Sequence, residues 1–200
     1  GGVDPGGTLT AKTETWNGSA WVEVNDLNTS RRYLAGAGAN NTSGLAFSGF
    51  SPPSTRYNNT ENWNGYTWTE VNNLNTARNS GTGIGTATSA LMVGSDPHTG
   101  KTESWNGTNW TELNDLNTNR GLFASSGADN TSGLVFGGDD PGSVAVTETW
   151  NGTNWTEVND LNTAIQVHGG MGTATAALSF GGSPPTGATE EWNGTNWTEI

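Results

Sequence analysis

The 200-residue sequence contains no cysteine, which excludes disulfide bonds and thiol chemistry. It also has little positive charge, because seven Lys and Arg stand against nineteen Asp and Glu and the net charge is −12. Such a chain repels phosphate backbones and anionic lipid surfaces, so we expect no nucleic-acid partner. No apolar run approaches the roughly 18 residues that a membrane span needs, and we expect no membrane-spanning segment.

Hydrophobic residues make up only 31% of the chain, a value that alone would favour disorder. Ten Trp, five Phe and three Tyr nevertheless supply large buried areas per side chain. We therefore expect one compact domain over residues 1–200. Its opening residues, "GGVDPGG", have neither an initiator Met nor the apolar stretch of a signal peptide, and we expect a processed product or a piece of a longer chain.

The tryptophans reveal an internal repeat. They fall in five pairs with a spacing of five residues, at Trp16 and Trp21, Trp63 and Trp68, Trp105 and Trp110, Trp150 and Trp155, and Trp192 and Trp197. Successive pairs are separated by 47, 42, 45 and 42 residues. This period is typical of four-stranded units repeated around an axis, whereas stacked helix pairs repeat at about 34 residues.

Each repeat reads as short apolar or Thr-rich runs cut by Gly, Asn, Asp and Pro clusters, a pattern typical of strands and tight turns. The phrase "WNG" recurs in every copy and predicts a tight hairpin, because Asn and Gly both tolerate positive φ. Five outer hairpins are expected at 8–24, 56–71, 101–113, 146–158 and 188–200. Only four inner strand pairs are expected, at 32–49, 79–94, 121–138 and 166–182. The domain thus divides into a half unit, 1–31, and units 32–78, 79–120, 121–165 and 166–200.

These units resemble the kelch repeat. The double glycine of that repeat is matched by Gly137-Gly138 and Gly181-Gly182, and "LNTAR" resembles its closing loop. Trp150 and Trp192 would take the position of the kelch Tyr, and Trp155 and Trp197 that of its Trp. The sequence departs from the pattern at Ser48-Gly49, at Gly94-Ser95 and at Ile165, which replaces a repeated Arg. The resemblance implies an all-β protein, a β-propeller of four-stranded antiparallel blades with about five repeat units.

The repeat text also resembles highly repetitive "WNG…WTE" proteins of marine phage and environmental sequences. That resemblance implies a virion surface, tail or fibre protein in an extracellular setting. The missing inner pair would leave the first hairpin with unpaired strand edges, which are sites of association. We therefore expect five structural units that are either trimmed from a longer chain or completed by another copy through strand exchange, and the second alternative gives a homo-oligomer.

The charged candidate for a binding surface is a repeated arginine, Arg31, Arg78 and Arg120. These side chains could bond loop carbonyls or a neighbouring Glu, or form a ring that reads an anionic ligand. The Trp pairs are expected to form the structural core between units, with sugar stacking at exposed Trp as the alternative.

Other candidates are more simply structural. Two sets of repeated carboxylates could suggest glycoside hydrolysis. No copy is singled out for catalysis, however, and a solvated strand face or bonds to backbone amides explain both sets. The sets are Glu14, Glu61, Glu103, Glu148 and Glu190, and Glu23, Glu70, Glu112, Glu157 and Glu199. The turn residues Asp26, Asn73, Asp115 and Asp160 lack calcium-loop spacing and are expected to cap turns. His98 and His168 are isolated, so no metal or cofactor is expected.

Composition and pattern together favour a module that binds protein or glycan, or serves a structural role, without catalysis. A lectin-like carbohydrate-binding propeller is one alternative, and it predicts Trp side chains open to solvent between units. An engineered repeat scaffold, or a propeller fragment that assembles by strand exchange, is another. Fold alone cannot choose among them, because propellers carry many unrelated functions.

Overall fold

The computed structural model describes all residues, 1–200, and is all-β without helices, so it has no helix that could cross a bilayer. Its main elements are four antiparallel four-stranded sheets. The strands are β5 (Ala35–Asn40), β6 (Ser43–Phe47), β9 (Thr60–Trp63) and β10 (Trp68–Val71); β11 (Thr82–Thr86), β12 (Ser89–Ser95), β13 (Thr99–Trp105) and β14 (Trp110–Glu112); β15 (Ala124–Asp129), β16 (Ser132–Phe136), β17 (Thr147–Trp150) and β18 (Trp155–Val158); and β19 (Gly169–Gly172), β20 (Ala177–Phe180), β21 (Thr189–Trp192) and β22 (Trp197–Glu199).

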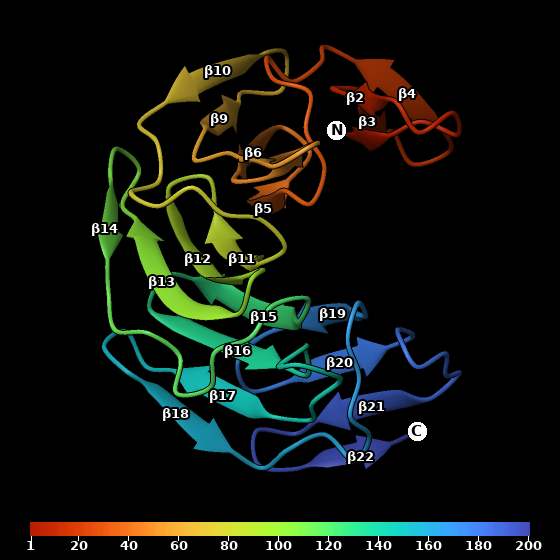
Figure 1. Ribbon diagram of the computed structural model, residues 1–200, viewed down its shortest axis with the longest axis vertical. Coiled ribbons are helices and arrows are strands. Elements are labelled where there is room, and N and C mark those ends of the chain that lie inside the picture. The colour runs from red at the N-terminus through yellow and green to blue at the C-terminus, as the bar shows by residue number, and fades with distance from the viewer.

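In each sheet the strands lie side by side in chain order. Figure 1 shows the four sheets following one another around an arc, with β5, β11, β15 and β19 toward its inside and β10, β14, β18 and β22 on its outside. Neighbouring inner strands contact one another in series, β5 with β11, β11 with β15, and β15 with β19. The arc is open on the side where the two chain termini lie (Figure 1).

Three further ladders have only two strands. They are β1 (Gly2–Val3) with β2 (Leu9–Thr10), β3 (Thr13–Trp16) with β4 (Trp21–Val24), and β7 (Phe50–Ser51) with β8 (Thr55–Arg56). The hairpin β3–β4 has the register of the outer hairpins of the complete sheets, but no inner pair adjoins it. The four inner pairs and five outer hairpins expected from the sequence are therefore present, and the short ladders β1–β2 and β7–β8 were not anticipated.

The "WNG" hairpins are wider than the tight turn expected from the sequence. In the hairpin after β17, Trp150 pairs with Trp155, which leaves a four-residue loop. Gly152 alone has a positive φ, of 90°, while the side chain of Asn151 accepts hydrogen bonds from the backbone amides of Thr153 and Asn154, each at 2.9 Å. The Asn side chain thus stabilises the loop as an Asx turn, and only the Gly position needs left-handed backbone.

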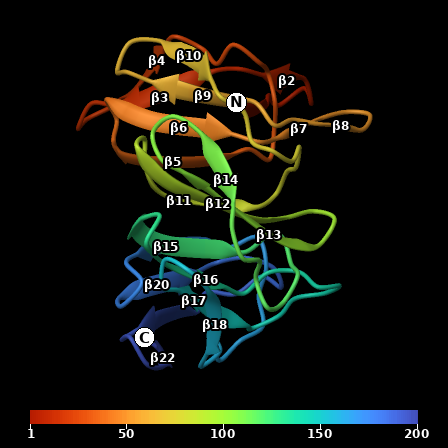
Figure 2. The same cartoon turned by 90° about the vertical axis from the view of Figure 1, so that its left-hand side faces the viewer.

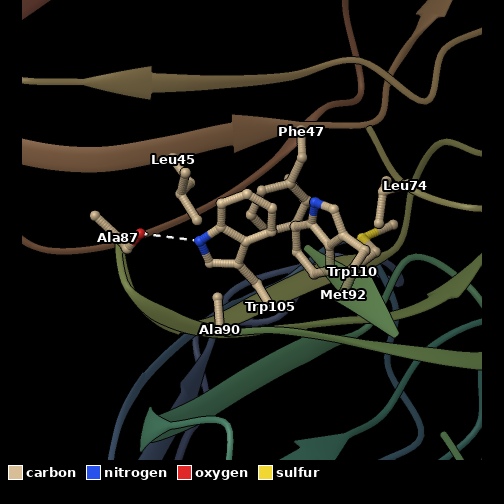
Figure 3. Close-up of a cluster of buried hydrophobic side chains, with 9 residues drawn as sticks. Leu45, Phe47, Leu74, Ala87, Ala90, Met92, Trp105 and Trp110 are labelled. Atoms are coloured by element: carbon tan, nitrogen blue, oxygen red, sulfur yellow. Dashed lines mark hydrogen bonds between the residues drawn. The ribbon is translucent and has the colours of Figure 1, made fainter. Parts of the chain in front are cut away.

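The core lies between adjacent sheets rather than in one central mass. Figure 3 shows the cluster between the sheets of β6 and β13, in which Trp105 and Trp110 pack against Phe47 and Met92. The rings of Phe47 and Trp110 meet edge to face with centroids 5.0 Å apart. Equivalent clusters join the second sheet to the third and the third to the fourth. Each sheet is therefore stabilised mainly by its neighbours, as in repeat proteins generally.

Candidate functional site

The three repeated arginines lie inside the protein, each in an ion pair with a glutamate on the third strand of the next sheet. The pairs are Arg31 with Glu61 at 2.6 Å, Arg78 with Glu103 at 3.1 Å, and Arg120 with Glu148 at 2.5 Å. All six side chains are almost fully buried. Burial lowers the pKa of Arg78, while the carboxylate of Glu103 opposes the shift. A buried pair of this kind needs further hydrogen bonds to offset its desolvation.

Those hydrogen bonds come from an asparagine that the sequence reasoning missed. The backbone N–H and side-chain amide of Asn117 both donate to Glu148 Oε2 at 2.8 Å, and the side-chain amide also donates to Trp155 O at 3.0 Å. Asn28, Asn75 and Asn162 make the same contacts in the other copies. The signal was the recurring phrase "LNT", whose Asn stands at one fixed place in every copy. We call this set, one Arg, one Glu and one Asn per junction, the Arg–Glu–Asn clamp.

The last junction has only part of the clamp. Ile165 occupies the arginine position and packs into the apolar cluster of the third and fourth sheets. Glu190 keeps the two bonds from Asn162 and one from the Thr163 amide at 3.1 Å. Across the chain, the sequence alternative in which each Arg bonds a neighbouring Glu matches the geometry. The alternative of a ligand-reading ring at the surface loses its basis for Arg31, Arg78 and Arg120, because their guanidinium groups are enclosed and face carboxylates.

Seven of the ten tryptophans are buried, and their indole N–H groups follow two repeated patterns. A Trp on the third strand donates to a backbone carbonyl in the turn between the first two strands of its own sheet, as Trp105 does to Ala87 O at 3.1 Å (Figure 3). A Trp on the fourth strand donates to a Thr on the preceding sheet, as Trp110 does to Thr60 Oγ1 at 2.9 Å. The expected packing role therefore applies to Trp63, Trp105, Trp110, Trp150, Trp155, Trp192 and Trp197.

The other three tryptophans mark an open groove at the N-terminal hairpin. Trp16 is 46% exposed and Trp21 is 65% exposed, and Trp68 is only half-buried. They border a hollow of about 330 Å³ between β3 and the sheet that follows, which Ala37 and Asn41 also line. β3 pairs only with β4, so its other edge is unpaired where a complete sheet has its second strand.

The remaining sequence candidates have local structural partners. Asp115 accepts a hydrogen bond from the Thr102 amide at 3.3 Å, and Asp26, Asn73 and Asp160 bond their own copies of that amide. His98 Nε2 lies 2.9 Å from Asp139 Oδ2, a contact that lowers the pKa of Asp139. No group of three or more His, Asp or Glu side chains is placed to hold a metal ion.

The connections between second and third strands form the most variable part of the molecule. They comprise residues 48–59, 96–98, 137–146 and 181–188, and no two have the same length. Figure 2 shows β7–β8 and the connections that follow β12 and β16 projecting to the same side of the arc. Short bridges tie them to the loops that enter the sheets, as in Arg32 with Phe50 and Asn79 with Asp96. We call this side the loop face.

No protein-family model matches the chain, and a search of curated proteins found no similar sequence.

Proposed function

We propose that the chain forms a kelch-like β-propeller that acts as a non-catalytic binding module and presents its loop face to protein or glycan. Four sheets in chain order, with inner strands in contact around an arc, support the propeller. In this reading each sheet is one blade. The extracellular or virion-surface setting suggested by the phage resemblance belongs to the same proposal.

One observation carries the binding role: constant and variable positions are segregated in space. The clamp residues, the indole N–H bonds and the "WNG" turns recur from unit to unit and hold the sheets together. The loop face differs in every unit in both length and composition. Loops held by a rigid scaffold are where binding residues concentrate, since they can change without disturbing the core. Four of the five Glu at this repeat position, Glu61, Glu103, Glu148 and Glu190, are already engaged in structural bonds, which favours binding over acid–base catalysis.

A glycan array probed with five proteins tests this role. The wild type is compared with three variants in which residues 51–56, 139–143 or 183–187 are replaced by Gly and Ser of equal length. We expect the wild type to bind one glycan class and at least one loop variant to lose that binding without a change in unfolding temperature. Thr153→Ala, in an exposed "WNG" turn, is the matched control and should bind normally. Binding that survives all three loop changes would contradict the loop face as the site.

A second candidate, assembly through another copy, is favoured by the groove at Trp16 and Trp21. The lectin-like alternative also predicted open Trp between units, but this is the one place where strongly exposed Trp occur, and the absence of an inner pair accounts for them. An unpaired strand edge beside an apolar hollow is a template for an incoming strand. Light scattering across a dilution series tests this: a stable multiple of the chain mass supports assembly, and a monomer at all concentrations contradicts it.

A further inference from the structure

Most of the Lys and Arg side chains of this acidic protein form an ion pair with a carboxylate. Of the seven Lys and Arg, five form ion pairs with Glu, namely Lys12, Arg31, Arg78, Lys101 and Arg120. The remaining two, Arg32 and Arg56, have no carboxylate within ion-pair distance. Both line the same hollow of about 380 Å³ on the loop face. Two unpaired cations therefore meet at one place in a protein that carries a net charge of −12.

Arg32 is held by aromatic rings rather than by acceptors. Its guanidinium carbon lies 4.9 Å from the centroid of Tyr33 and 5.4 Å from that of Phe50. Its Nε is buried without a hydrogen-bond partner, and no side-chain nitrogen of Arg32 donates a bond within the protein. Stacking on rings fixes the plane of a guanidinium while leaving its edge free to bind an acceptor.

Arg56 reaches the hollow from the end of β8. Its Nε donates to Asn79 Oδ1 at 3.1 Å and to the backbone oxygen of Asp96 at 3.3 Å. These bonds anchor the side chain against the next unit, and its two terminal nitrogens have no protein partner. An anchored Nε with free terminal nitrogens is suited to a two-point hydrogen bond with a carboxylate.

Comparison of the repeat units shows that neither arginine is part of the repeated structural framework. Backbone bridges align Arg32 with Asn79, Gly121 and Gln166. Arg56 stands four residues before the repeated "TE" of its unit, and His98, Ser143 and Pro185 occupy that position in the other units. No other unit has an Arg or Lys at either position, so folding does not require one there. Tyr33, at a position where the other units have Ser80, Leu122 and Val167, is 52% exposed beside the same hollow.

We infer that Arg32 and Arg56 bind the carboxylate of a sugar acid, such as a uronic acid, whose ring lies on Tyr33. Two guanidinium groups that line one hollow can both donate to a single carboxylate, and the face of Tyr33 that Arg32 leaves open suits the apolar face of a sugar ring. Ser54, Asn79 and the exposed carboxylate of Asp96 also line the hollow and offer partners for sugar hydroxyls. The strong negative charge of the whole chain disfavours a polyanion and favours a ligand with a single charge. This assignment rests on the proposed binding function and names its ligand class.

NMR titration with D-glucuronate tests the assignment directly, with the neutral D-glucuronamide as the matched ligand. We expect chemical-shift changes at Tyr33 and in residues 50–56, saturating at millimolar concentrations, with glucuronamide at least about 10-fold weaker because it lacks the charge. Arg32→Gln and Arg56→Gln should each weaken glucuronate binding by about 10-fold or more. Lys12→Gln makes the same change in net charge at an exposed pair that does not line the hollow, and it should leave binding unchanged.

Three other results would each overturn the assignment. Equal binding of glucuronate and acetate would show a general anion site without sugar recognition. Equal loss of affinity in Lys12→Gln would show that long-range charge, not the hollow, attracts the ligand. No shift change with glucuronate would remove the site altogether. If the array detects a neutral glycan that Arg56→Gln still binds, the proposed function stands while this assignment fails. If array binding survives all three loop replacements but glucuronate binds the hollow of the wild type, this assignment stands while the proposed glycan site on the wider loop face fails.

Discussion

Two hairpins of similar sequence have different environments. Thr13–Val24 reads "TETWNGSAWVEV" and residues 102–113 read "TESWNGTNWTEL", and the two hairpins share one pairing register. Their Trp rings lie at similar separations, 5.8 Å for Trp16 and Trp21 and 5.4 Å for Trp105 and Trp110. Yet the first two Trp are 46% and 65% exposed, and the second two 1% and 6%. Local sequence therefore determines the hairpin, while neighbouring sheets determine what it buries.

The last unit differs from the interior units in a complementary way. It has all four strands but replaces the clamp arginine with Ile165, and its inner strand begins after His168 where the preceding unit has Phe123. Only one complete sheet adjoins it, so its other side packs against no neighbouring sheet. The ends of the arc thus keep the repeated local geometry while losing the contacts between units.

Truncating a tryptophan should show the largest contrast between the ends and the interior. Trp110→Ala removes a buried ring that packs on Phe47 and bonds Thr60, and we expect it to lower the free energy of unfolding by about 3–5 kcal/mol. Trp21→Ala removes a ring that is mostly in water, and its effect should stay below about 1 kcal/mol. Urea denaturation followed by circular dichroism measures both.

Equal losses in the two variants would contradict this comparison. Such a result would mean that the groove at Trp21 is covered in solution, and the dilution series proposed above would then show a multimer. Thr111→Ala, an exposed neighbour on β14, is the control for the change of strand propensity and should have little effect.

Replacing a clamp arginine should lower the free energy of unfolding somewhat less than truncating Trp110. It shows whether the interior units need the Arg–Glu ion pair that the last unit lacks. Arg120→Ile makes the third junction resemble the fourth, and leaves the fully buried Glu148 without its cation. We expect a loss of about 3 kcal/mol, and the double variant with Glu148→Gln should recover most of it, because removing both charges removes the desolvation cost. A loss below about 1 kcal/mol in Arg120→Ile would instead show that the Asn117 and Thr118 bonds suffice alone, as their equivalents do at Glu190.

Much of the fold could be predicted because the same strand and turn pattern recurs several times in the sequence. The period and the Trp pairs marked the strands, and the count of inner and outer pairs anticipated the half unit β3–β4. The ion-pair partner of each Arg could not be predicted, since Arg31 and Glu61 are 30 residues apart in the sequence and meet only when successive units pack together. The hollow at Arg32 and Arg56 was missed for the opposite reason: reading by repeat directs attention to what recurs, and these residues occur once.

His168 should give the smallest effect and the one that depends on pH. Burial lowers its pKa from the usual 6.5 to about 4, and the contact with the backbone of Phe136 opposes only part of that shift. The unfolded chain therefore binds a proton more readily than the folded protein between these values, so stability present above pH 6.5 is lost as the pH falls toward 4. His168→Phe, which copies Phe123 of the preceding unit, should remove about 1–3 kcal/mol of that loss. Urea denaturation of the variant and of the wild type at pH 7, 5.5 and 4.5 measures it. If His168→Phe shows the same decline as the wild type over this range, the ring is already open to water, and the junction between the third and fourth sheets is looser than the packing of His168 against Phe136 indicates.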